Sequence, residues 1–379
     1  MKLERSARVA MRGDSSIWLM AAVLGLLWAV LAVLPQTRGV FLTQNNLATL
    51  LVQSSVLLVI SVGMTMVILI RGIDLSVGAG VALTGTVAAL VQIKFGGSAE
   101  LAIVAAVAVG ALLGAWHGWW ASRGIPAFVV TLAGFKAYRG GALVLSGSKG
   151  LSPMSHDFGL LASSLPVSAT FAIVLVALAA GIALTVRDAA RRKHFKLEPL
   201  TSRVVALRVG AQVVLATLVL IVFADRGMPV QVLIAGTVAI WGVFVTQRTR
   251  FGRHLFAIGG NPDAARLSGI DVKKTTIAAY VIVGVLTAIA GVMLAARVNG
   301  VTPGNQGNLL ELDAVTAVVI GGTALAGGRG SIAGTVLGTL VFSTLSNGMN
   351  HLHVDSNWQL IFTGLVLLAA VQLSQGKRT

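Results

Sequence analysis

Long apolar runs recur along the whole chain, and they restrict the possible fold more than any other feature. Twelve of these runs are long enough to be read as membrane-crossing helices, with boundaries good to a few residues. Helices are the expected spanning elements because a lipid interior offers backbone groups no other partners. The predicted spans are 17–34, 47–70, 75–93, 100–121, 126–146, 165–186, 204–223, 230–246, 276–296, 312–326, 332–349 and 358–374.

The composition argues against a soluble enzyme. Hydrophobic residues make up 56% of the 379 residues and charged residues only 11%, whereas soluble domains are about 25% charged. The chain has no Cys, which excludes disulfides and Cys-based metal or redox sites. No His pairs with an acidic residue at metal-ligand spacing within a predicted helix, and His351 and His353 fall in a short outer loop, so neither a metal site nor another cofactor is expected.

The distribution of positive charge predicts the topology. The formal net charge is +16, and 21 of the 29 Lys and Arg residues fall in segments that are inside if the N-terminus is inside, against five outside. This asymmetry satisfies the positive-inside rule, so the charge needs no nucleic-acid partner to explain it. The sequence predicts an all-α polytopic bundle of ten to twelve spans, with both termini in the cytoplasm.

The predicted organisation is one membrane domain with short tails. Residues 1–16 form a cytoplasmic N-terminal tail, 17–374 the membrane domain and 375–379 a cytoplasmic C-terminal tail. The first apolar run is expected to be a retained helix rather than a cleaved signal. The spans at 75–93 and 312–326 are rich in Gly, so either is expected to be a half-helix or a broken helix.

A short helix is predicted inside the basic loop 247–275. Asn261 suits the N-cap, Pro262 the first helical position, and Asp263 the positive end of the helix dipole. Gly269 then ends the helix. A capped helix of this kind is suited to a groove on a cytoplasmic partner; the alternative is a basic loop that binds lipid headgroups.

No acidic residue lies clearly at the centre of a span, which argues against a proton- or sodium-coupled carrier. In the turn at 71–76, Asp74 is expected to cap the following helix or to pair with Arg71. This turn is interpreted either as a capped connection or as part of the transport path. The residues considered for that path and its gating are Gly72, Asp74, Ser76, Thr84, Gly321 and Gly322.

Four motifs resemble the monosaccharide permeases of bacterial ABC importers. They are GIDLSVG at 72–78, AIGGNPDAARLSGI at 257–270, ELDAVTAVVIGGTALAGGRGSIAGTVLGTL at 311–340 and NGMN with VDSNWQ between 347 and 359. Within that family the sequence looks most similar to D-xylose permeases. Two additional spans and a basic loop within 165–223 favour the xylose type, although a related sugar permease fits them as well.

The resemblance implies an importer permease fold in the bacterial inner membrane and a specific set of partners. Two permease copies would pair with two cytoplasmic ATP-binding subunits, and a periplasmic sugar-binding protein would deliver the sugar. The chain itself would perform no covalent chemistry. It has no GxxxxGK[ST] phosphate loop, so ATP hydrolysis would belong to the separate subunit.

The resemblance also implies a coupling helix that seats on the ATP-binding subunit. Replacement of Gly269 or Arg266 is then expected to abolish stimulated ATP hydrolysis. The predicted coupling residues are Gly260, Asn261, Pro262, Asp263, Ala264, Ala265, Arg266, Leu267, Ser268 and Gly269.

On the outer side, four basic residues are predicted to meet acidic residues of the binding protein. They are Arg38, Lys149, Arg226 and Arg297; scattered surface charge is the alternative interpretation. Two other functions stay open on the sequence: an ion-coupled secondary sugar carrier, and an ABC permease for another small solute such as a branched amino acid.

Overall fold

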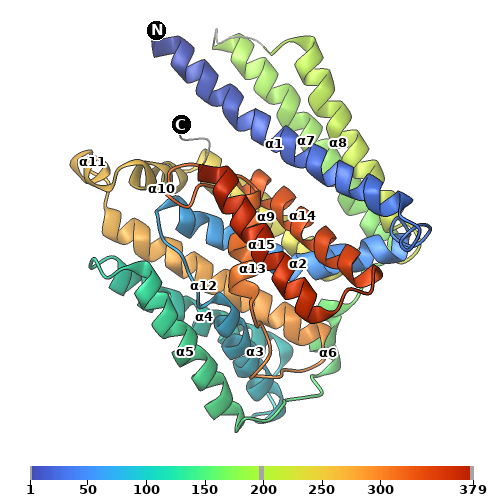
Figure 1. Ribbon diagram of the computed structural model, residues 1–379, viewed down its shortest axis with the longest axis vertical. Coiled ribbons are helices and arrows are strands. Elements are labelled where there is room, and N and C mark those ends of the chain that lie inside the picture. The colour runs from blue at the N-terminus through green and yellow to red at the C-terminus, as the bar shows by residue number, and fades with distance from the viewer. Residues whose placement is uncertain (1, 196–199, 376–379) are drawn as a thin grey trace.

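The computed structural model describes residues 2–195 and 200–375, and in these ranges the chain is built from helices (Figure 1). The predicted all-α class is confirmed. The helices are α1 (Lys2–Val33), α2 (Gln44–Leu69), α3 (Val77–Ile93), α4 (Ala99–Ala121), α5 (Ala127–Ser146), α6 (His156–Gly159), η1 (Leu160–Ala162), α7 (Val167–His194), α8 (Ser202–Val222), α9 (Val230–Arg248), α10 (Arg250–Gly260), α11 (Pro262–Leu267), α12 (Val272–Arg297), α13 (Leu310–Ile320), α14 (Ile332–His351) and α15 (Ser356–Gln375).

Eight of these helices, within the described ranges, are long and apolar enough to cross a membrane: α2, α4, α5, α7, α8, α9, α12 and α14. Three shorter apolar helical segments, Ile17–Val33, Val77–Ile93 and Ser356–Gln372, add to them. Together they establish a polytopic membrane protein. Residues 2–16, predicted as a separate tail, continue α1, and residues 376–379 of the predicted C-terminal tail lie outside the described residues.

The two Gly-rich spans differ from each other. Helix α3 is a continuous helix of 17 residues, whereas α13 has only 11 residues and ends at Ile320 instead of the expected 326. It ends there because Gly321 and Gly322 follow, and Gly322 has a left-handed backbone with φ of 86°. At 1.5 Å per residue, α13 covers only about 17 Å, about half of a bilayer interior.

The centre of the bundle is formed by α2 and α12, whose residues dominate the main apolar core. Helix α4 packs along α12 through Gly110, Gly114 and Gly118, which the sequence spaces four apart. A methyl group at Gly114 would lie 2.2 Å from the carbonyl oxygen of Tyr280. Without a hydrophobic force between helices in lipid, this close approach is what holds α4 against α12.

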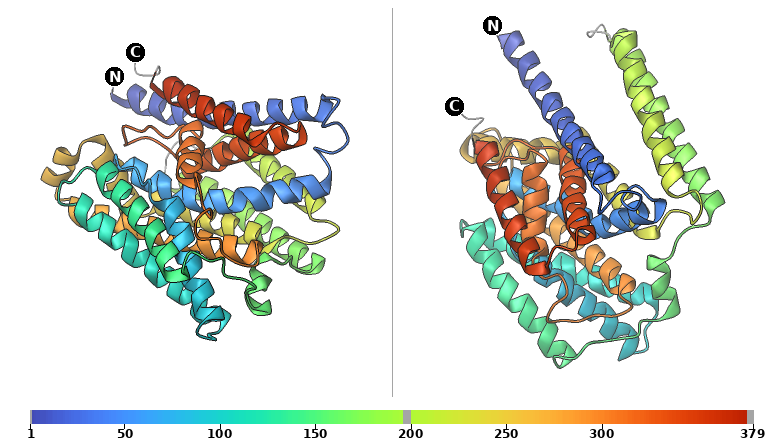
Figure 2. Two further views of the ribbon diagram at one scale, coloured as in Figure 1. Left: turned by 60° about the horizontal axis from the view of Figure 1, so that its bottom comes forward. Right: turned by 45° about the vertical axis from the view of Figure 1, so that its right-hand side comes forward.

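Helices α7 and α8 form a hairpin that diverges from α1 toward one end of the molecule (Figure 2). Polar contacts join the two helices to each other. The Gln212 amide donates to the Thr185 hydroxyl at 3.0 Å, and the Asp188 carboxylate lies 3.7 Å from the Arg208 guanidinium. Two helices thus occupy the region 165–223, where two additional spans are predicted; of the predicted basic loop, residues 196–199 lie outside the described part of the chain.

Candidate functional site

The short helix predicted in the loop 247–275 is present as α11, which follows α10 directly. The Asn261 side-chain oxygen accepts hydrogen bonds from the backbone N–H groups of Asp263 and Ala264, both at 3.0 Å. Gly269 has φ of 82°, a left-handed conformation that ends the helix. After it, the Asp271 carboxylate accepts a hydrogen bond from the Lys274 backbone, which lowers the pKa of Asp271.

Helix α11 presents one side to the bundle and the other to its surroundings. Ala265 is buried, whereas Leu267 is 90% exposed. Arg266 and Asp263 form an exposed ion pair at 3.9 Å, a type of contact that contributes little to stability. Leu267 and the ion pair thus face away from the bundle.

Arg71, in the turn between α2 and α3, joins this turn to the C-terminal end of α10, directly before α11. Its Nε donates to the Gly259 carbonyl at 2.8 Å and its Nη2 to the Gly260 carbonyl at 2.7 Å. Arg71 holds a left-handed backbone with φ of 68°, a conformation that costs a non-glycine residue free energy. The two hydrogen bonds therefore fix both the side chain and the turn.

Three backbone segments meet beside Arg71. The Gly328 N–H donates to the Leu69 carbonyl at 2.9 Å, and Gly259 lies between them. A methyl group at Gly259 would lie 1.8 Å from the Leu69 oxygen and 2.3 Å from the Gly328 nitrogen. We call these four residues, Leu69, Arg71, Gly259 and Gly328, the junction; only Gly fits at its centre.

Asp74 lies a few residues beyond the junction and is 2% exposed. Its carboxylate accepts hydrogen bonds from the Ser76 backbone at 2.8 Å and the Ser76 hydroxyl at 2.6 Å, and lies 3.6 Å from Nδ1 of His117 on α4. The Nε2 of His117 is 3.0 Å from the Tyr138 hydroxyl on α5. Asp74 thus pairs with His117 and not with Arg71, and Ser76 takes the N-cap position of α3.

A cavity of about 10 Å³ adjoins this cluster, lined by residues that include Asp74, His117, Tyr138 and Thr287. The hydroxyl groups of Thr287 and Tyr280, both on α12, have no hydrogen-bond partner among the described residues. Such a cavity has about the volume of one water molecule. The cluster therefore connects the α2–α3 turn with α4, α5 and α12, but it is too small to hold a sugar.

The other residues predicted for the transport path lie apart from this cluster. Thr84 is buried in α3, where its hydroxyl donates to the Gly80 carbonyl at 2.8 Å. Gly321 follows α13 and packs against α14, so that a methyl group there would lie 2.4 Å from the Gly334 oxygen. The structure thus brings Gly72, Asp74 and Ser76 together in one turn and places Thr84, Gly321 and Gly322 elsewhere.

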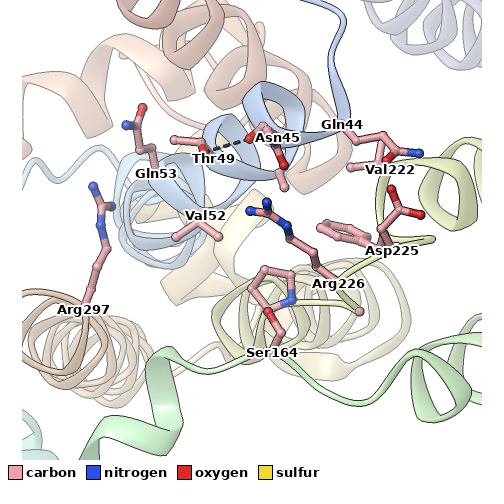
Figure 3. A pocket seen from close by; sticks show the side chains of 14 residues that line it. Gln44, Asn45, Thr49, Val52, Gln53, Ser164, Val222, Asp225, Arg226 and Arg297 are labelled. Atoms are coloured by element: carbon pink, nitrogen blue, oxygen red, sulfur yellow. Dashed lines mark hydrogen bonds between the residues drawn. The ribbon is translucent and has the colours of Figure 1, made fainter.

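Arg226 and Arg297, two of the four predicted docking residues, line one cavity of about 250 Å³ (Figure 3). Arg226 follows α8 and Arg297 ends α12. Arg38, in the connection between α1 and α2, and Lys149, after α5, are not among the lining residues. The sequence did not indicate that any of the four shares a cavity.

A family described as "Branched-chain amino acid transport system / permease component" matches residues 46–371. The xylose transport system permease protein XylH of Escherichia coli (strain K12) is 40% identical over 348 residues, 90% of this chain and 88% of the relative. The chain belongs to this permease family.

Two further relatives align over almost the whole permease. The xylose transport system permease protein XylH of Haemophilus influenzae is 37% identical over 367 residues, 96% of each chain. The ribose import permease protein RbsC of Escherichia coli (strain K12) is 35% identical over 365 residues, 95% of each chain. No solved structure matches the chain.

Sequence reasoning missed His117 and Tyr138 as site residues, and for Arg71 it considered only Asp74 as a partner and not Gly259. Each was visible as a polar side chain near apolar runs, but the partners lie far away in the sequence, 188 residues away in the case of Arg71 and Gly259. Arg139 offered a signal because it falls inside a predicted span, where a charge costs about 2.5–3.5 kcal/mol. Its Nη1 donates to the carbonyls of Pro303 and Gln306, both at 2.8 Å.

Proposed function

We propose that the chain is the membrane-spanning subunit of an ATP-driven monosaccharide importer, with D-xylose as its substrate. The observation that carries this proposal is the near full-length identity to permeases named for xylose transport, 40% and 37% over 90% and 96% of this chain. As a permease subunit it moves its substrate without chemical change, and it resides in the inner membrane.

The proposed partners are a cytoplasmic ATP-binding subunit, a periplasmic sugar-binding protein and a second copy of this chain. Helix α11 supports the first of these, because Leu267 and the pair Asp263–Arg266 face outward from a helix that is capped at both ends. The proposed coupling segment is residues 260–269. The four exposed basic residues remain proposed contacts for the binding protein; they are Arg38, Lys149, Arg226 and Arg297.

In the proposed mechanism, ATP-driven movement of α11 is passed to the bundle through the junction. Arg71 and Gly259 connect the end of α10, which leads into α11, to the α2–α3 turn. From that turn, the contact of Asp74 with His117 and of His117 with Tyr138 reaches α4 and α5. Close-packed interiors shift between discrete arrangements instead of deforming gradually, so a displaced turn re-packs these helices.

A second candidate is a permease for a branched-chain amino acid, which the description of the matching family favours. A direct comparison of substrates decides between the two. A strain that lacks this gene is supplied with single carbon sources or with leucine, and uptake of labelled D-xylose, D-ribose and leucine is measured. We expect loss of xylose uptake, restored by the intact gene; loss of leucine uptake alone would overturn the sugar assignment.

A further inference from the structure

The cavity beside Arg226 lies at the end of the bundle that is far from α11. Helix α2 ends at the junction, α9 leads into α10, and α12 follows α11. Their other ends, at Gln44, Val230 and Arg297, therefore lie together at the opposite end. The cavity is formed there by the first turns of α2, the connection between α8 and α9, and the last turn of α12.

Most polar side chains in this cavity have no hydrogen-bond or ion-pair partner among the described residues. Among the described residues, Gln44 donates to the Ile221 carbonyl at 2.9 Å and Thr49 to the Asn45 carbonyl at 2.8 Å. The other six make no side-chain hydrogen bond or ion pair within residues 2–195 and 200–375; they are Asn45, Gln53, Ser164, Asp225, Arg226 and Arg297.

Figure 3 shows how these groups are arranged. Arg226 extends toward α2, Gln53 and Arg297 lie on one side of it, and Asp225 and Gln44 lie on the other. Val52 and Pro229, both half-buried, add an apolar surface. Donors, acceptors of both amide and carboxylate type, and an apolar surface thus surround one space.

The mixture of charges selects the class of ligand. A phosphate or carboxylate would meet the Asp225 carboxylate, and a cation would meet two guanidinium groups. A neutral polyol has hydroxyl groups that both donate and accept, so it can use amides, a carboxylate and guanidinium groups together. The cavity, about 250 Å³, is smaller than the clefts of about 300–1,000 Å³ that hold drug-sized ligands, which suits a single sugar ring.

We propose that this cavity is a receiving site for a neutral monosaccharide, placed within one permease subunit at the end that faces the binding protein. This inference rests on the proposed function, because it takes the transported sugar as the ligand. Arg226 and Arg297 then donate hydrogen bonds to sugar oxygens. The hydroxyl groups of the sugar are recognised through hydrogen bonds with Asn45, Gln53 and Asp225. An apolar face of the ring packs on Val52 and Pro229.

Sugar uptake by the full complex in vesicles tests the site. Gln53→Ala and Asp225→Ala are the test variants; both side chains are exposed, so folding is not at risk. Asn357→Ala is the matched control, since Asn357 is an exposed carboxamide at the same end and outside the cavity. We expect each test variant to raise KM for D-xylose about tenfold, with ATP hydrolysis in the absence of sugar unchanged and the control at wild-type KM.

The Asp225→Asn variant distinguishes a site for a neutral ligand from a site for an anion. A sugar site keeps most of its affinity, because the amide still forms hydrogen bonds, whereas an anion site gains affinity when the negative charge is lost. Two results would overturn the receiving site. One is a wild-type KM in both alanine variants; the other is that these variants change only the amount of phospholipid retained by the purified complex. Absence of sugar uptake by the wild-type complex would instead refute the proposed function.

Discussion

The two ends of the bundle use their polar groups in opposite ways. At the α11 end, the carbonyls of Leu69, Gly259 and Gly260 are bonded to Gly328 and Arg71, and no room is left at Gly259 for a methyl group. At the other end, side chains such as Gln53 and Asp225 surround an open cavity without partners in the described part of the chain. Closely joined backbone segments transmit a displacement, whereas unpaired side chains are free to bind a ligand.

The largest effect is expected from Gly259→Ala, which breaks the junction. Its new methyl group would overlap the Leu69 oxygen, and overpacking of this kind costs about 1–3 kcal/mol. We expect ATP-dependent sugar uptake in vesicles to fall by at least tenfold. Gly236→Ala is the matched control, because Gly236 lies within α9, outside the coupling segment, and nothing lies within 4 Å of a methyl group there. Equal loss in both variants would show that the junction is not the sensitive element.

Two replacements of Arg71 distinguish the role of its side-chain hydrogen bonds from the role of its backbone conformation. Arg71→Ala removes two charge-assisted hydrogen bonds, each worth about 1.5–3 kcal/mol, and leaves a left-handed Ala. Arg71→Gly removes the same bonds but relieves the backbone strain. We expect both variants to hydrolyse ATP with little sugar moved per ATP, as measured by simultaneous uptake and phosphate release. Recovery of transport in Arg71→Gly alone would mean that only the turn conformation matters.

Both of these residues illustrate what sequence can and cannot predict here. Helix α11 was predictable because its signals are local: Asn261, Pro262 and Asp263 begin it and Gly269 ends it. The contact between Arg71 and Gly259 spans 188 residues, and the pairing of Asp74 with His117 joins separate helices. No local pattern specifies such contacts, and the cavity at Arg226 likewise depends on three elements that meet only in the folded chain.

A smaller effect is expected from Leu267→Asp on α11. Leu267 is 90% exposed, so its replacement leaves the thermal stability of the permease unchanged. If it enters an apolar groove on the ATP-binding subunit, a charge there weakens the complex by about tenfold or more in Kd. Binding of the two purified proteins, measured in detergent, is the readout. Unchanged Kd would show that α11 does not bind through this residue.

The smallest effect is expected at Gly269, where α11 ends. Its φ of 82° costs Ala about 1 kcal/mol, and Asn less, because Asn tolerates the left-handed region. Since nothing lies within 4 Å of a methyl group at Gly269, the complete loss of stimulated ATP hydrolysis expected from the sequence becomes a severalfold fall in Gly269→Ala. We expect near wild-type hydrolysis in Gly269→Asn. The reverse order would indicate that Gly269 is needed for close contact with the partner and not for its backbone conformation.

Reconstitution of the purified permease in vesicles tests the central claim, that the force for transport enters through α11 from a separate ATP-binding subunit. Uptake of labelled D-xylose is measured with the permease alone under a proton or sodium gradient, and then with the ATP-binding subunit, binding protein and ATP but no gradient. The account predicts accumulation only in the second case, and its loss in Gly259→Ala. Accumulation by the permease alone under an ion gradient would contradict it.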